Sequence, residues 1–237
     1  MKKILITGAT SGIGLALTQY YSSHKNLVYA CGRNNMTQLE SMANNVIPLS
    51  FDIAQLQQVK QAAKEVDSLD LIILNAGNCQ YINDPRHFDS ALFESVIKTN
   101  LISQAYLLEC LLPLLNKGGQ IAFMGSSVTY LPLSRAEAYG ASKAGLDYLA
   151  MSLAVDLKSE DIHVSIIEPG FVKTPLTDKN DFPMPFLISS QQACNYIVKG
   201  LEKKKARISF PKRMIFLMKL LSLMPENWWI NLARRIA

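Results

Sequence analysis

The chain has few residues of the kinds that bind metals or form disulfides, and it has no long apolar run. Its 237 residues include only four cysteines and three histidines. These are Cys31, Cys79, Cys110, Cys194, His24, His87 and His163. The cysteines match no metal or redox spacing and the histidines sit in unrelated contexts, so we predict reduced thiols in a cytoplasmic protein and no metal site. No segment reaches the roughly 18 apolar residues of a transmembrane helix.

Charge is scarce over most of the chain and concentrated near its end. Only 18% of the residues are charged, while 49% are hydrophobic, which is typical of a globular protein. Residues 199–237 carry ten Lys and Arg against two acids, or +8, so residues 1–198 carry 14 against 17, or −3. A nearly neutral body argues against a nucleic-acid partner. The apolar run in "MKKILITGAT" is too short for a signal peptide and predicts a first strand instead.

The order of apolar runs predicts an α/β fold with a doubly wound parallel sheet, which is Rossmann-like. A strand over 2–6, the glycine turn "TGATSGIG", a helix over 13–24 and the strand "LVYACGR" follow one another. Further strands are predicted at "NVIPLSFD", "LDLIILNAG", "GGQIAFMGSS" and "IHVSIIEPG". The fully apolar character of these runs fits parallel strands that are covered on both faces. We therefore predict one domain over 1–210 and a helical C-terminal extension over 211–237.

The glycine turn between the first strand and helix predicts a dinucleotide site. Gly8, Gly12 and Gly14 would permit a tight turn, close approach to a pyrophosphate and close packing of the helix on the strand. The N–H groups at the start of that helix would then face the phosphates. Such a glycine pattern is weak by itself, and its position between strand and helix strengthens it.

A second motif places a phenol and an ammonium one helical turn apart. The run over 138–157 predicts a long helix, and Tyr139 and Lys143 within it share a face at i and i+4. Ser126 and Ser127 lie about a dozen residues upstream. An isolated pair of this kind is usually two surface side chains, so its meaning depends on the rest of the chain.

Seven features in a fixed order give the chain a family resemblance. They are "TGATSGIG" at 7–14, Asp52, "NAG" at 75–77, Asn100, the serine pair at 126–127, "YGASK" at 139–143, and "PG" with a following threonine at 169–174. Together they resemble the short-chain dehydrogenase/reductase family in its single-domain form, over residues 1 to about 210. One departure is Leu74, where many members have a second asparagine before "NAG".

The resemblance implies a set of catalytic residues. The family's tyrosine, lysine and asparagine map onto Tyr139, Lys143 and Asn100, and its usual spacing selects Ser126, with Ser127 as the fallback. Asn100 would anchor a water that joins Lys143 to solvent. The implied activity is an NAD(P)-dependent oxidoreductase that interconverts alcohols and carbonyl compounds by hydride transfer.

The expected chemistry turns on the ionisation of Tyr139. A free tyrosine has a pKa near ~10, so it is a poor base at neutral pH. The Lys143 ammonium and an oxidised nicotinamide would both favour the phenolate and bring this pKa to about 7. Tyr139 would then exchange a proton with the substrate oxygen, to which Ser126 donates a hydrogen bond. Lys143 would also hold the nicotinamide ribose.

Cofactor choice is expected at the end of the second strand. Gly32 stands where an acid would select NAD, and Arg33 follows it, so NADP(H) is favoured over NAD(H). Asp52 would cap the adenine side. The predicted cofactor-binding residues are Gly8, Ser11, Gly12, Ile13, Gly14, Arg33, Asp52, Ile53, Asn75, Ala76, Gly77, Tyr139, Lys143, Pro169, Gly170, Val172 and Thr174.

The substrate and the assembly are less well defined by the sequence. The stretch "FPMPF" at 182–186 lies where the family has its mobile substrate loop. It is either an apolar substrate wall or ordinary hydrophobic packing. The resemblance implies a small carbonyl or alcohol substrate and a homodimer or homotetramer.

The extension has three alternative roles. "KRMIFLMKLLSLM" is apolar almost all round, and in "PENWWINLARRIA" Trp228, Leu232 and Ile236 share one face. The helices lie in a membrane interface, making the protein peripheral on the inner face of a membrane, or they form a cleft lid or subunit contact, or they pack on their own body. For the whole protein, a nucleotide-binding regulator or scaffold without turnover is the alternative to an enzyme. The complete set Asn100, Ser126, Tyr139 and Lys143 favours the enzyme.

Overall fold

The core of the molecule is a parallel sheet of seven strands in the order β3-β2-β1-β4-β5-β6-β9. The computed structural model describes the backbone of residues 1–236 and the side chains of residues 1–234, so Ala237 and the predicted face position of Ile236 lie outside the described part. The strands are β1 (Lys3–Thr7), β2 (Leu27–Gly32), β3 (Val46–Ser50), β4 (Leu69–Leu74), β5 (Leu115–Met124), β6 (His163–Pro169) and β9 (Arg207–Phe210). The doubly wound α/β fold is therefore confirmed.

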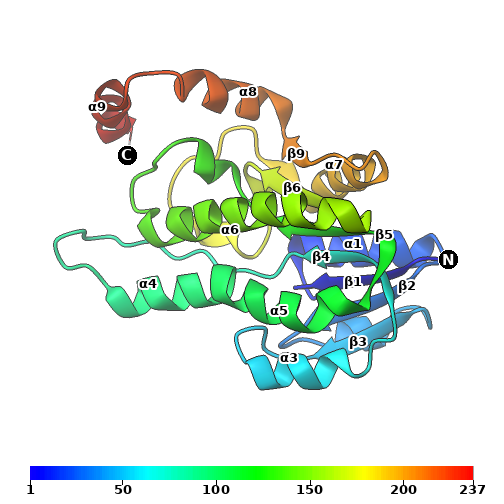
Figure 1. Ribbon diagram of the computed structural model, residues 1–237. Coiled ribbons are helices and arrows are strands. Elements are labelled where there is room, and N and C mark those ends of the chain that lie inside the picture. Colours follow the sequence, from blue (N-terminus) through cyan, green and yellow to red (C-terminus); the bar gives the residue numbers. More distant parts are fainter. Residues whose placement is uncertain (237) are drawn as a thin grey trace.

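Helices cover both faces of this sheet (Figure 1). They are α1 (Gly12–Ser23), α2 (Thr37–Glu40), α3 (Leu56–Ala63), α4 (Ser90–Ile97), α5 (Ser103–Leu111), α6 (Glu137–Asp156) and α7 (Ser190–Glu202). Residues of α1 and α7 pack with Ile4 and Ile6 of β1, whereas α3, α5 and α6 pack with Leu5 on the other side. The alternation along β1 follows from the two-residue period of a strand.

Two local features were not predicted from the sequence. A π-helical turn at Lys98–Ile102 joins α4 to α5 and contains Asn100. Such turns are frequent at functional sites. A small parallel pair, β7 (Val172–Lys173) and β8 (Ile188–Ser189), brackets the segment that contains "FPMPF".

The extension consists of α8 (Lys212–Leu221) and α9 (Glu226–Ile236), which lie beyond β9 at one edge of the sheet (Figure 1). Met214, Ile215 and Met218 of α8 are buried against the body. Trp229 of α9 is also buried, and its indole N–H donates to the Pro132 carbonyl at 2.8 Å. Packing on the body thus accounts for one face of the extension. No described helix is long and apolar enough to cross a bilayer.

Candidate active site

A cleft of about 480 Å³ opens where the ends of β1, β2, β4, β5 and β6 meet. The glycine turn forms its floor. Gly8 has φ +67°, which only glycine adopts readily, and a Cβ added to Gly14 would lie 2.1 Å from the Gly8 carbonyl oxygen. The helix start therefore sits directly against the strand end. Ser11 caps α1 without a side-chain hydrogen bond, and the first N–H groups of α1 lie at the cleft that Ser11, Gly12 and Ile13 line.

Thr7 fixes the opposite wall of this cleft, and the sequence did not single it out. Its hydroxyl accepts hydrogen bonds from the backbone N–H groups of Asn75 at 2.9 Å and Ala76 at 3.0 Å. The Asn75 amide donates in return to the carbonyls of Thr7 at 2.9 Å and Gly8 at 3.3 Å. These bonds hold the "NAG" segment against the glycine turn.

Tyr139, Ser126 and Lys143 come together on the other side of the cleft. Tyr139 and Lys143 lie on α6, and the Lys143 Nζ is 5.7 Å from the centre of the Tyr139 ring. Ser126 lies near the Tyr139 phenol and lowers its pKa, while its hydroxyl accepts a hydrogen bond from the Val128 N–H at 3.2 Å. Lys143 is only 4% exposed, and its ammonium donates to the Met124 carbonyl at 2.7 Å.

Burial controls the ionisation of this group. Burial raises the pKa of Tyr139, Cys79 raises it further, and the nearby Ser126 hydroxyl acts in the opposite direction. Burial also lowers the pKa of Lys143 to about 8. The protein alone therefore does not lower the tyrosine pKa as expected. The reason is that desolvation of the phenolate outweighs an ammonium that is directed at Met124.

Asn100 positions the loop behind Gly77. Its side chain accepts from the Asn78 N–H at 2.8 Å and donates to the Asn78 carbonyl and the Ser142 hydroxyl, both at 2.9 Å. A Cβ at Gly77 would lie 3.0 Å from the Asn100 Oδ1. In the structure Asn100 clamps the backbone that lines the cleft, a role that the sequence did not suggest.

Arg33 and Asp52 lie at the far end of the cleft, beyond β2 and β3. The Arg33 Nη1 is 3.4 Å from the Asp52 Oδ2, and the Arg33 side chain is 68% exposed. Such an exposed pair contributes at most about 1 kcal/mol, so it can exchange for another anion at little cost. Thr10 lies beside Gly32, with its methyl group 2.5 Å from where a Cβ would stand.

The segment after β6 closes the third side. Pro169, Gly170, Val172 and Thr174 line the cleft. Thr177, which was not predicted, shapes this segment, because its hydroxyl donates to the Val172 carbonyl at 2.7 Å and accepts from the Thr174 N–H at 3.0 Å.

Three aromatic side chains, Tyr81, Phe171 and Phe182, form a cluster that includes the "FPMPF" segment. The Tyr81 ring is 5.7 Å from the Phe182 ring, and Phe182 is 6.1 Å from Phe171. Arg135 stacks over Tyr81 at 5.3 Å and pairs with both carboxylate oxygens of Asp181, at 2.9 and 3.1 Å. Phe182 of "FPMPF" therefore packs in an aromatic cluster next to the Arg135–Asp181 ion pair. This packing is compatible both with an apolar substrate wall and with ordinary hydrophobic packing.

Most predicted residues line the one cleft, and three lie just behind it. Gly14 packs on the Gly8 carbonyl, Asn100 lies behind Gly77, and Ser126 lies near the Tyr139 phenol. Lining residues that the sequence did not predict are Thr10, Cys31, Gly32, Asn34, Asn35, Phe51, Asn78, Thr99, Met124, Gly125, Pro175, Leu176 and Thr177. The one sign of these residues in the sequence was their position near the ends of the predicted strands. Over the described residues, no cluster of three His, Cys, Asp or Glu side chains is placed to hold a metal.

The residues present fit a dinucleotide. The glycine turn leaves backbone exposed where any Cβ would intrude, α1 directs N–H groups at the cleft, and an arginine stands at the far end.

Comparisons with known proteins show the family and the fold of this chain. The family model described as "short chain dehydrogenase" matches residues 2–183. An uncharacterized oxidoreductase of Myxococcus xanthus is 32% identical over 98% of this chain and 96% of its own. The 11-beta-hydroxysteroid dehydrogenase 1A of Arabidopsis thaliana is 27% identical over 93% of this chain and 72% of its own. A short chain dehydrogenase from Burkholderia cenocepacia, solved in complex with NADP, has a TM-score of 0.86 at 20% identity, covering 98% and 97% of the two chains.

Proposed function

Because this chain belongs to the short-chain dehydrogenase family and is an oxidoreductase acting on CH–OH or C=O groups, we propose that it interconverts an alcohol and a carbonyl compound with NADP(H), using Tyr139 as general acid and base. The observation that carries the proposal is the Tyr139 phenol, which lies near Ser126 and the Lys143 ammonium at one wall of a cleft whose floor is a glycine turn.

Tyr139 handles the proton at the substrate oxygen. Its raised pKa keeps the phenol protonated at neutral pH, so it can donate a proton to the oxygen of a carbonyl substrate. In the reverse direction the phenolate has to form first, and the Lys143 ammonium is the nearby positive charge that favours it. Ser126 orients the oxygen by a hydrogen bond. When bound, the nicotinamide supplies or accepts the hydride.

Arg33 supports NADP(H) as the cofactor. It stands at the end of β2 where no carboxylate is available at Gly32, and its guanidinium can exchange Asp52 for a phosphate. Lys143 would hold the ribose at the other end. That the solved Burkholderia cenocepacia relative was crystallised with NADP also supports this choice.

The side chains around Tyr139 favour a small substrate that has an apolar part. Tyr81, Phe171 and Phe182 would supply the apolar contacts, and Ser126 and Tyr139 the polar ones. We also propose a cytoplasmic homo-oligomer, which the exposed apolar side chains Tyr148, Met151 and Val155 on α6 support.

The test is the Tyr139→Phe variant, assayed with a panel of carbonyl compounds and alcohols by the absorbance of the reduced cofactor. We expect turnover to fall by about a hundredfold or more while the cofactor still binds, because only the proton donor is lost. Tyr148→Phe, on the exposed part of α6, is the matched control and should keep its turnover. A Tyr139→Phe variant with most of its activity would contradict the mechanism. A chain that binds the cofactor and turns over no substrate would favour the regulator or scaffold.

A further inference from the structure

Helix α8 has two apolar faces, and the residues that the structure describes cover one of them. Met214, Ile215 and Met218 face the body, whereas Phe216 is 71% exposed and Leu220 is 53% exposed on the opposite side. A surface helix of a globular protein normally turns polar residues outward. The outward side of α8 is therefore built for contact with something other than water.

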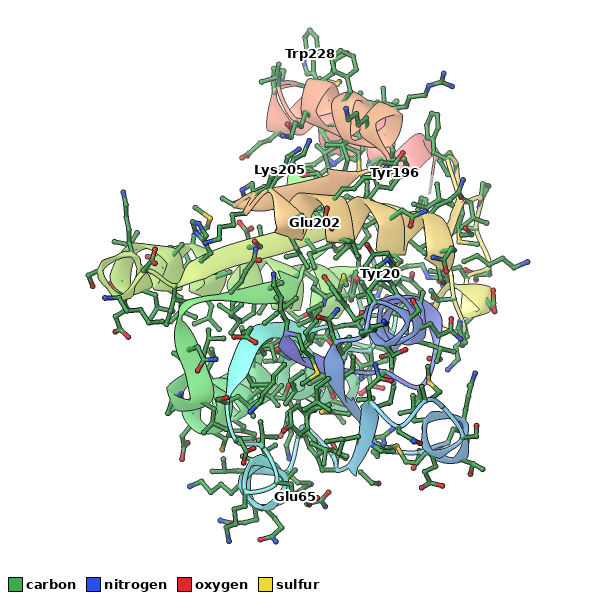
Figure 2. All side chains as sticks on the ribbon, turned by 90° about the vertical axis from the view of Figure 1, so that its right-hand side faces the viewer. Tyr20, Glu65, Tyr196, Glu202, Lys205 and Trp228 are labelled. Carbon is green, nitrogen blue, oxygen red and sulfur yellow. The ribbon has the colours of Figure 1, made fainter. Side chains whose placement is uncertain are left out.

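The exposed face continues past the end of α8. Phe216, Leu220 and Leu223 follow the i, i+4, i+7 spacing, and Leu223 is 80% exposed. Trp228 at the start of α9 is 66% exposed and points away from the body (Figure 2). We call these four side chains the outer apolar face.

Positive charge surrounds this face. Lys212 and Arg213 at the start of α8 are exposed, and Lys203, Lys204 and Lys205 are exposed on the turn before β9. Glu226 is the one acidic residue in the sequence from 211 to 237. Apolar side chains with a tryptophan, bordered by basic residues, match the boundary between anionic headgroups and acyl chains.

The face is also held rigidly. Met214 and Met218 anchor α8, and the Trp229 indole N–H fixes α9 to the Pro132 carbonyl. The outer apolar face is thus already ordered, which lowers the entropy cost of binding. A helix of ten residues is about 15 Å long, half of a bilayer core, so it can lie in the interface but cannot cross.

We propose that α8 and the start of α9 dock the protein on anionic phospholipid bilayers through the outer apolar face. A second copy of the chain fits this face less well, because a two-fold contact would bring two segments of +8 charge together. This docking goes beyond the proposed oxidoreductase activity and does not depend on it.

The test mixes the full chain with vesicles of phosphatidylcholine, with and without phosphatidylglycerol. We expect co-sedimentation with the anionic vesicles at about 0.05 M salt and much less at about 0.5 M, where charges are screened over a shorter distance. Trp229 is already buried, so a blue shift of the emission should come from Trp228 and disappear in Trp228→Phe. Absence of co-sedimentation at low salt would overturn the proposal.

Two pairs of variants separate the outer apolar face from general effects. Phe216→Ser should weaken partitioning about tenfold or more, and Phe88→Ser, another exposed phenylalanine, should not. Lys212→Glu should weaken partitioning by about fivefold for each unit of charge. Lys64→Glu, at the exposed turn just after α3, makes the same net change in charge without that loss. Thermal unfolding of each variant checks folding.

Equal losses in the control variants would overturn the proposal. A second outcome would also overturn it. If the wild type binds no vesicles and Phe216→Ser lowers the size of the particle in light scattering, a second copy of the chain covers the outer apolar face. Activity in solution is measured separately, so a failure of docking is distinguishable from a failure of the proposed reaction.

Discussion

Arg33 is the side chain on which the cofactor preference depends. Arg33→Ala should weaken the binding of NADPH about 10- to 100-fold more than the binding of NADH. The reason is that a charge-assisted hydrogen bond to the 2′-phosphate is lost, and only NADPH carries this phosphate. Binding titrations with both cofactors measure this. Arg86→Ala, an exposed arginine outside the cleft, is the control. Equal losses for both cofactors would remove the basis for NADP(H).

Lys143 gives the site a pH-dependent stability. Its pKa is lowered by burial from 10.5 to about 8, so the unfolded chain binds more protons between these values and the stability rises with pH. We expect the wild type to gain stability relative to Lys143→Met as the pH rises from about 8 to 10.5. The free energy of unfolding, measured with denaturant across this range, is the readout. A constant difference between the two proteins would show that the ammonium is not desolvated.

Single contacts at this scale also explain which residues the sequence missed. No sequence motif marks Thr7 or Thr177. Their hydroxyls become important only because the fold brings them within hydrogen-bond distance of the Asn75 N–H and the Val172 carbonyl. Cys79 similarly affects the pKa of Tyr139 only through spatial proximity.

At the scale of elements, a buried carboxylate joins β6, β9 and α6. Glu168 on β6 is 1% exposed and accepts bonds from Arg207 and from the Tyr130 and Ser209 hydroxyls, both at 2.6 Å. Arg207 on β9 also makes a two-pronged contact with Asp147 on α6, at 2.8 and 2.9 Å. Glu168 directly precedes Pro169 and Gly170, so this cluster supports the cleft wall from outside.

Arg207→Met should therefore destabilise the fold. The substitution leaves the Glu168 charge buried without its cation, and we expect a loss of about 3 kcal/mol in the free energy of unfolding. Denaturant unfolding measures the loss, and adding Glu168→Gln to the same chain should restore part of it. Lys60→Met, which breaks the exposed pair with Glu109, is the control and should change the free energy of unfolding far less. Similar effects of the two substitutions would argue against the cluster.

At the scale of the whole molecule, charge is separated between a body of −3 and a C-terminal segment of +8. The sheet order places β9 at one edge, so this segment extends from the sheet rather than covering its centre (Figure 1). The two apolar faces of α8 follow from this position, because only one of them meets the body. A salt-dependent attraction to anionic surfaces is the expected property of such a molecule.

The sequence alone determined the element order and most of the cleft. Apolar runs predicted the parallel strands. The spacing of the glycines and of Tyr139 and Lys143 predicted that these residues line one site. Both patterns extend over only a few residues, so they can be recognised in the sequence. The predicted long helix over 138–157 became α6 (Glu137–Asp156), with a shift of one residue at each end.

Only the tertiary structure decided how these parts act on each other. The direction of the Tyr139 pKa depends on burial by distant segments, and the partners of Arg33, Asn100 and Lys143 lie 19 to 42 residues away. The same holds for the extension, where the sequence left three roles open and packing covered one face of α8. Desolvation and long-range contacts depend on the whole fold, so no local pattern can specify them.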